Sequence, residues 1–321
     1  ELHADSSLSP LRWDGFRVTT DSFEATGSSK MKEISLEGIK TGIDAGGVTR
    51  GVWSVLPSRI GTISATYDMT APALPDEPIE SSPVIAKKAW YDSWIPKKVE
   101  TDSLIVGDTR IKVILPSGPA ELSGTRWEVE PMEGFEKAKF RALGGTIKLP
   151  FAWAPTMNLD QMRLTYQSGF LYLTSSEFSV YENGHLDLAG ECDLTDQSYS
   201  FEGSMRDVLC NEVLPSDWKQ RLSGKVESSF TIRSSNESPV IKGHVAVQRC
   251  TLTALSVLDK LAAYSQSLRF RTLTLHAAEC DFEWSGNRIM LTNVKLGSEG
   301  LARMEGKVTF SRATADEPFR M

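Results

Sequence analysis

Short segments in which apolar and polar residues alternate recur along most of this chain, and many of them contain a glycine. Alternation with a period of two places the apolar side chains of a strand on one face of a sheet. Glycine inside such a strand is typical of a bulge or a bend. The glycine-bearing segments are Leu188–Leu194, Phe201–Met205, Leu222–Val226, Ile241–Val245 and Met304–Val308.

The predicted fold is therefore mainly β, with a few short helices. Strands spaced by roughly ten residues are typical of antiparallel meanders, and Asn183-Gly184 is a strong hairpin signal. We expect a long, curved antiparallel sheet that forms either a groove or an open sandwich. The apolar face of such a sheet must be covered by a helix, a second layer, a loop or a lipid.

One segment departs from the period of two. From Leu252 to Tyr264 an apolar residue recurs at every third position, without an internal glycine or proline. Thr253 is a candidate N-cap. This spacing predicts one amphipathic helix of about four turns over 252–265. Strands precede and follow it, so that 223–310 forms a strand, a helix and a further meander.

Prolines divide the chain into regions. Five of them fall within 70–100, where they break regular structure and predict an exposed loop. Before it we expect a small β unit over 1–69, with a short helical crossover at Ala45–Val55. After it we expect a long antiparallel domain over 101–321.

Three aromatic residues stand near the end of the predicted loop: Trp90, Tyr91 and Trp94. Exposed aromatic side chains are unusual in a plain linker. Two interpretations remain open, because these residues either pack the loop back onto the sheet or form a hydrophobic gate or partner contact.

Composition limits the function classes. The 321 residues are 40% hydrophobic and 24% charged, which is ordinary for a folded protein. A net charge of −7 disfavours a general nucleic-acid binder. No apolar run approaches the roughly 18 to 20 residues of a membrane span, and no signal peptide is visible.

The chain contains no motif for catalysis or for a cofactor. Nucleophile elbows, zinc signatures, phosphate loops, dinucleotide fingerprints and calcium loops are absent. The four histidines and four cysteines lack metal-ligand spacing. We therefore expect no enzyme, no cofactor and no metal. Cys250 and Cys280 flank the predicted helix, either as disulfide-bonded sheet neighbours or as two buried free thiols.

The C-terminal part resembles AsmA-like proteins of Gram-negative envelopes. Ile241–Val247 is similar to the glycine-bearing strand of that family, and Thr251–Ala262 to its leucine–aspartate–leucine helix. The strands and the final glycine turn that close the unit are matched by Phe270–Leu275, Ile289–Leu296 and Met304–Val308. The resemblance is firmest from Ser223 to Phe310.

This resemblance implies a non-enzymatic envelope protein that handles or transfers lipid through an apolar β groove and supports outer-membrane assembly. The implied partners are phospholipid or another acyl-chain lipid, other envelope proteins, and a membrane reached through an anchor that precedes Glu1. The implied location is the periplasm or cell envelope of a Gram-negative bacterium. The groove candidates are Met162, Leu164, Tyr166, Leu171, Leu173, Phe178, Val180, Leu186, Leu188, Phe230 and Ile232.

A second hypothesis is a periplasmic or surface β-rich interaction module that binds protein or glycan through its aromatic-rich loop. The groove candidates would then form the core of a closed sandwich. An open groove favours lipid handling, and a closed core with an exposed aromatic patch near Trp90 and Trp94 favours the module. A hydrolase is the least favoured class, because it requires a His joined to a carboxylate and a Ser or Cys.

Overall fold

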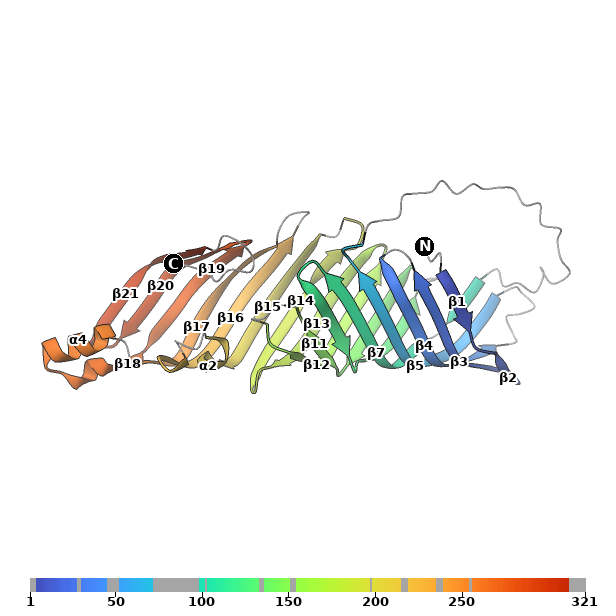
Figure 1. The fold of residues 1–321 in the computed structure, drawn as a ribbon, viewed down its shortest axis with the longest axis horizontal. Helices are drawn as coiled ribbons and strands as arrows, with labels where there is room; N and C mark the ends of the chain where they lie inside the picture. The colour runs from blue at the N-terminus through green and yellow to red at the C-terminus, as the bar shows by residue number, and fades with distance from the viewer. Residues whose placement is uncertain are drawn as a thin grey trace. The chain divides into compact units, whose positions relative to one another are not determined.

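The protein is described by a computed structural model that covers residues 4–27, 30–44, 52–71, 98–101, 103–132, 136–150, 154–196, 198–214, 219–234, 239–253 and 256–311. Its contacts divide it into two compact units, Glu1–Ser168 and Gly169–Met321. Both units consist mainly of antiparallel strands, as the sequence predicts (Figure 1). Most of the predicted loop, including its three aromatic residues, lies outside the described residues.

The strands of the first unit form a continuous ladder. β1 and β2 pair with one edge of β3, which is followed by β4 and β5. From β7 the ladder continues through β8 and β9 to β10 and β11, and ends at β12. The bounds are β1 Ala4–Leu8, β2 Arg12–Asp14, β3 Arg17–Gly27, β4 Met31–Asp44, β5 Val52–Asp68, β6 Lys98–Thr101, β7 Leu104–Leu115, β8 Gly118–Ser123, β9 Arg126–Met132, β10 Lys137–Leu143, β11 Thr146–Lys148 and β12 Met157–Gln167.

Two features of the first unit differ from the sequence prediction. The helical crossover expected at Ala45–Val55 is wrong for its last four residues, because β5 begins at Val52. The β-branched and aromatic residues there favour a strand, and residues 45–51 lie outside the described part. In addition, β5 pairs in parallel with β6 and β7, whereas the sequence predicted antiparallel meanders.

A line of close backbone contacts crosses the strands of the first unit at glycines. A Cβ on Gly107 would lie 2.8 Å from the carbonyl oxygen of Gly61, so no side chain fits there. A Cβ on Gly145 would lie 2.9 Å from the carbonyl oxygen of Ser123, and its φ of 112° is one that glycine adopts readily. Glycine therefore lets neighbouring strands approach closely here, a role that the predicted bends and bulges did not include.

The strands of the second unit lie side by side almost in chain order (Figure 1). The exception is β17, which pairs with two strands along the same edge: its last residues pair with β18 and its first residues pair with β19. The bounds are β13 Phe170–Val180, β14 Gly184–Asp193, β15 Tyr199–Leu209, α2 Cys210–Val213, β16 Leu222–Ser234, β17 Val240–Thr253, α4 Ser256–Ser265, η2 (a 3-10 helix) Leu268–Arg271, β18 Thr272–Leu275, β19 Ala277–Ser285, β20 Arg288–Ser298 and β21 Ala302–Ser311.

Bulges keep the apolar residues of the second unit on one face. In β13 the apolar residues change from odd positions (Leu171 and Leu173) to even positions (Phe178 and Val180). The register with β14 shifts between Leu173 and Ser176, and the extra residue returns the later apolar side chains to the original face. Similar shifts occur in β15 before Val208 and in β20 before Val294.

The predicted helix is present, but it begins later than its apolar spacing suggested. Leu252 and Thr253 belong to β17, and α4 starts at Ser256. Thr253 does not cap the helix, because its hydroxyl donates to the carbonyl oxygen of Gln220 at 3.0 Å. Leu258 and Ala262 of α4 are buried at one end of the sheet, in or near a cluster that contains Cys250, Leu273, Leu275 and Ala278.

The four cysteines are free thiols. Cys250 lies opposite Leu275 in β18, and Cys280 lies opposite Val245 in β19, so the two are not cross-strand neighbours. The sequence left two interpretations open, a disulfide or two free thiols, and the structure contains two free thiols. Cys250 is fully buried and Cys280 is half-buried.

Candidate functional site

One face of the sheet in the second unit is apolar from β13 to β21. Cross-strand partners arrange its side chains in rows that run across the strands. The first row contains Leu173, Gly190, Phe201, Ile232, Ile241, Trp284, Ile289 and Phe310. The second row contains Ser176, Leu188, Gly203, Phe230, Gly243, Phe282, Leu291 and Val308. We call the surface formed by these two rows the apolar face.

Aromatic rings on the apolar face lie over glycines of the neighbouring strand. A Cβ on Gly203 would lie 2.5 Å from Cζ of Phe230, and a Cβ on Gly243 would lie 2.9 Å from Cε1 of Phe282. The same relation joins Gly190 to Phe201, at 2.6 Å. Each ring therefore occupies the space that a side chain of the next strand would fill, and the rows stay continuously apolar.

The apolar face is half-buried. Leu173, Leu188, Phe230, Phe282 and Leu291 all have intermediate exposure. By contrast, one cluster of buried apolar residues in this unit includes Leu258 of α4. The described strands of this unit form one ladder, and α4 packs on this cluster through Leu258. The apolar side chains of both rows therefore keep part of their surface accessible.

The opposite face of the same strands carries charge. Ion pairs join Arg206 to Asp187 at 3.0 Å, Lys242 to Glu283 at 3.2 Å and Lys295 to Glu279 at 2.9 Å. The hydrogen bond from Lys295 lowers the pKa of Glu279, and the same contact raises the pKa of Lys295. These side chains are all exposed to a third or more, so each pair adds little stability. The exposed ion pairs show that this face of the sheet is polar, so the sheet as a whole is amphipathic.

A histidine lies in the centre of this charged face. Nδ1 of His244 is 2.8 Å from Asp281, which also accepts a hydrogen bond from the Asn293 amide at 2.6 Å. These two contacts, first that of Asn293 and then that of His244, lower the pKa of Asp281. Within the described residues no group of three or more His, Cys, Asp or Glu side chains is placed to hold a metal ion.

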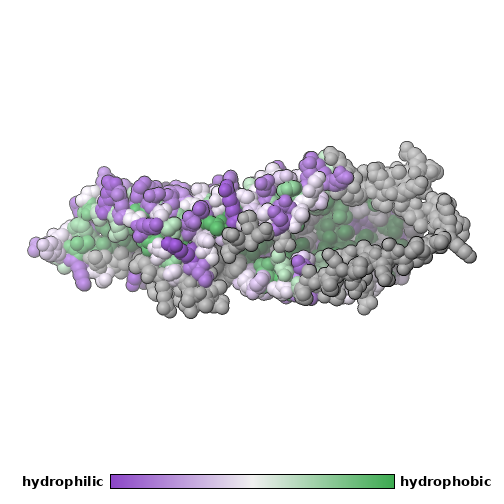
Figure 2. Space-filling model, turned by 90° about the horizontal axis from the view of Figure 1, so that it is seen from above, coloured by the Kyte–Doolittle hydropathy of each residue, from purple (hydrophilic) through white to green (hydrophobic). Residues whose placement is uncertain are grey.

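The first unit carries an apolar surface of the same kind. In β9, β10 and β12, Val129, Phe140 and Leu164 are partners across the strands, and the ring of Trp127 meets that of Phe140 edge to face at 6.4 Å. A second row crosses six strands and contains Ile34, Ala65, Ile111, Leu122, Ile147 and Met157. Hydrophobic residues line a hollow in the part of Figure 2 that belongs to this unit.

The predicted groove residues fall on these surfaces, in two separate groups. Met162, Leu164 and Tyr166 lie in β12 of the first unit, opposite Ala142, Phe140 and Ala138. The other predicted residues lie in β13, β14 and β16 of the second unit. Phe178 and Val180 are already covered by the protein, with 6% and 2% of their surface exposed. The remaining nine have intermediate exposure, and they are Met162, Leu164, Tyr166, Leu171, Leu173, Leu186, Leu188, Phe230 and Ile232.

Sequence reasoning missed the continuation of the same rows. In the second unit the missed residues are Phe201, Met205, Ile241, Val245, Phe282, Trp284, Ile289, Leu291, Val308 and Phe310. In the first unit they are Trp127, Val129 and Phe140. The signal was the same period of two, which runs through each of these strands, but it does not by itself show which strands are neighbours.

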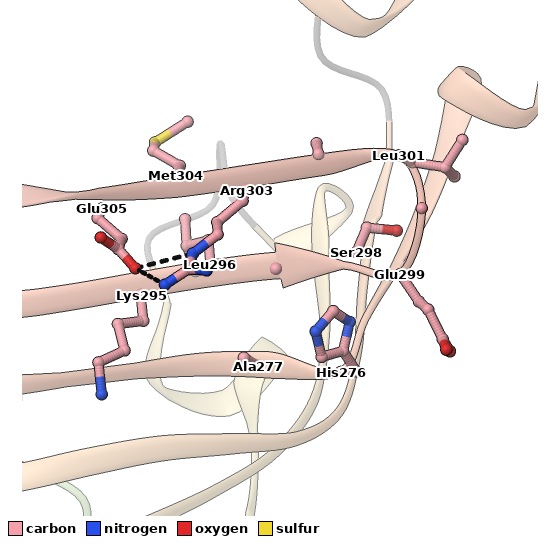
Figure 3. A pocket seen from close by; sticks show the side chains of 13 residues that line it. His276, Ala277, Lys295, Leu296, Ser298, Glu299, Leu301, Arg303, Met304 and Glu305 are labelled. Atoms are coloured by element: carbon pink, nitrogen blue, oxygen red, sulfur yellow. Dashed lines mark hydrogen bonds and ion pairs between the residues drawn. The ribbon is translucent and has the colours of Figure 1, made fainter.

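An open depression lies at the β20–β21 edge of the second unit (Figure 3). Three of its charged side chains are paired, because Nε of Arg303 donates to Glu305 at 2.8 Å and Lys295 contacts Glu279. Leu296, Leu301 and Met304 add apolar surface. The arrangement offers a shallow surface of mixed polar and apolar character.

None of the described helices is both long and apolar enough to cross a membrane. Comparisons of the chain with protein-family models, with curated proteins and with solved structures found no match.

Proposed function

We propose that this chain is a non-enzymatic protein that handles lipid by holding acyl chains against its apolar face. The observation that carries the proposal is the amphipathic sheet: a continuous apolar face of intermediate exposure, backed by a face of ion-paired charges. Large contiguous apolar surfaces on soluble proteins mark sites that bind a partner or a lipid. The second row, from Leu188 to Val308, supplies such a surface across seven neighbouring strands, β14 to β17 and β19 to β21.

The proposed mechanism is passive. An acyl chain placed on the rows removes apolar surface from water, which is worth roughly 25 cal/mol for each Å2 buried. The headgroup stays hydrated at the rim, so no charged group has to be desolvated. Rings that fill the space over Gly203 and Gly243 leave few gaps in the rows. A chain can therefore slide from strand to strand without meeting a polar barrier.

The resemblance to AsmA-like proteins adds a location and partners to this proposal. On this resemblance we propose that the protein acts in the periplasm or cell envelope of a Gram-negative bacterium and is anchored in the inner membrane in its full-length form. Phospholipid is then the lipid, other envelope proteins are the partners, and the lipid flow supports outer-membrane assembly. This part of the proposal rests on the sequence pattern of Ser223–Phe310.

The proposal is tested by native mass spectrometry of gently purified protein, followed by lipid extraction from the same sample. We expect phospholipid to copurify with the unaltered protein. A double variant, Leu164→Asp with Leu173→Asp, places a carboxylate on each apolar surface and should lose the lipid. The matched control, Thr165→Asp with Tyr172→Asp, introduces the same charges at adjacent positions on the opposite faces and should keep it.

Circular dichroism and thermal unfolding show whether each variant is folded. Loss of lipid from a folded apolar-face variant, with lipid retained by the control, supports the proposal. Unaltered protein that is free of lipid and binds no more hydrophobic dye than an ordinary globular domain contradicts it.

A second candidate function is the β-rich interaction module that binds protein or glycan. The specific observation in its favour is an exposed aromatic pair at the turn between β2 and β3, where Trp13 is 60% and Phe16 is 65% exposed. The same lipid measurement discriminates between the two candidates, because lipid-free protein with an intact fold leaves this pair as the best binding surface.

A further inference from the structure

Helix α4 is apolar on two sides. On the inner side, Leu258 and Ala262 are 5% and 6% exposed, packed at the end of the sheet. A helix packed on a protein surface normally presents polar residues on its other side. In α4, however, Leu261 is 43% exposed and Tyr264 is 92% exposed.

The exposed apolar residues form a short stripe. Leu261 and Tyr264 are three positions apart, so they lie on the same side of the helix. Leu268 follows in η2, which packs beside α4, and it is 73% exposed. Tyrosine has an apolar ring with a polar tip, which suits it to the boundary between lipid and water.

Basic residues belong to the same segment as this stripe. The segment 256–271 contains Lys260, Arg269 and Arg271 but only one acidic residue, Asp259, which lies 3.8 Å from Arg271. Within the described part of the chain, Lys260 and Arg269 have no ion-pair partner. This segment is therefore positively charged, whereas the whole chain has a net charge of −7.

Further basic residues lie at the same edge of the sheet. The backbone N–H of Thr253, at the end of β17, donates to the carbonyl oxygen of Arg221 at 2.8 Å. Lys219 and Arg221 precede β16, and Arg221 is therefore beside Thr253, the last residue of β17. Figure 1 shows α4 at this edge, next to β18.

We propose that this edge of the second unit docks on an anionic lipid surface. Leu261, Tyr264 and Leu268 enter the interface between headgroups and acyl chains, while Lys260 and Arg269 bind headgroup phosphates. Three apolar side chains are too few for a stable protein–protein interface, which buries about 1,200 Å2 or more. They suit shallow insertion into a membrane, where unpaired basic side chains add electrostatic attraction.

The docking surface is distinct from the apolar face and does not require it to hold lipid. The test is flotation of the full chain with vesicles of phosphatidylcholine alone and with vesicles that also contain phosphatidylglycerol. We expect the protein to float with the anionic vesicles and to be released by high salt. Reversal of two charges, Lys260→Glu with Arg269→Glu, should lower the partition coefficient by about tenfold or more, since each basic residue near such a surface contributes about 1 kcal/mol.

A second variant tests the apolar stripe. Tyr264→Ser with Leu268→Ser removes exposed side chains only, and it should weaken flotation while leaving thermal unfolding unchanged. The matched control, Leu194→Ser with Met304→Ser, alters residues that are 51% and 63% exposed elsewhere in the same unit. It should float like the unaltered protein.

The outcomes separate docking from lipid holding. The variant Leu164→Asp with Leu173→Asp should still float, even when its copurified lipid is lost. Absence of flotation with anionic vesicles overturns the docking proposal, and so does equal flotation of the charge-reversed variant. Equal binding to phosphatidylcholine alone also overturns it, because the basic residues would then have no role.

Discussion

At the scale of residues, the feature that stands out is the pairing of glycines with aromatic rings on the apolar face. Gly203 is the clearest example, because the Phe230 ring and the Leu188 side chain both occupy the space beside its Cα. Its backbone does not need the left-handed region, so the constraint is one of space alone. Gly306 in β21 has nothing within 4 Å of its would-be Cβ, although it also lies within a strand.

We expect Gly203→Ala to lower the free energy of unfolding by about 1–3 kcal/mol, because the new methyl group overpacks against Phe230. Gly306→Ala is the matched control and should be neutral or slightly stabilising. Urea denaturation monitored by circular dichroism measures both. If Phe230→Leu does not recover part of the loss in the Gly203→Ala background, the ring is not the cause of the strain.

The buried thiol of Cys250 gives a pH dependence at the same scale. Burial, with a smaller contribution from Cys210, raises the pKa of Cys250 from 9.0 to about 11. Below pH 9 the thiol is neutral in both the folded and the unfolded state. Above that pH the unfolded state releases the proton first, so stability falls as the pH rises towards 11.

We therefore expect Cys250→Ala to reduce the loss of stability between pH 9 and pH 11, even if the variant is less stable at neutral pH. The free energy of unfolding, measured for both proteins across that range, checks the sign. Parallel curves for the two proteins would show that the thiol does not titrate as described.

At the scale of elements, bulges decide which residues share a face. Asn293 in β20 has a φ of 51°, and the register with β21 shifts between Leu291 and Val294. If the same sequence formed a strand without a bulge, Val294 and Leu296 would point to the charged face. The sequence shows the change from odd to even apolar positions, but it does not show that a bulge absorbs it.

Deletion of Asn293 should therefore be tolerated, because Val294 then follows Thr292 directly and strict alternation keeps Val294 and Leu296 on the apolar face, opposite the same partners in β21. Deletion of Lys295 should be strongly destabilising, because either Val294 or Leu296 must then point to the charged face. Asn293→Gly keeps the bulge and loses only the 2.6 Å hydrogen bond to Asp281, so it should cost little. Thermal unfolding and hydrogen exchange in β20 and β21 measure the difference. A Lys295 deletion variant as stable as the Asn293 deletion variant would contradict the role assigned to the bulge.

At the scale of the whole molecule, alternation in the sequence was sufficient to predict the fold class and most strands. Alternation did not predict the parallel pairing of β5 with β7. The two strands are separated by the 35 residues between Asp68 and Leu104, and a period of two within each strand does not show that they pair. The start of α4 was also misplaced, because Leu252 and Thr253 complete a ladder with β16 and β18. Alternation within single strands was enough to identify individual groove candidates. The rows that these residues form could be recognised only from the register between neighbouring strands in the structure.

In the second unit the strands pair almost in the order in which the chain makes them, and each contacts little beyond its neighbours. Contacts that are local in sequence favour rapid folding, because few long loops have to close first. They also make stability close to a sum over adjacent strand pairs, as in repeat proteins. Such a sheet can gain or lose a hairpin between two others while the remaining pairs persist, so its length is free to vary without a change of architecture.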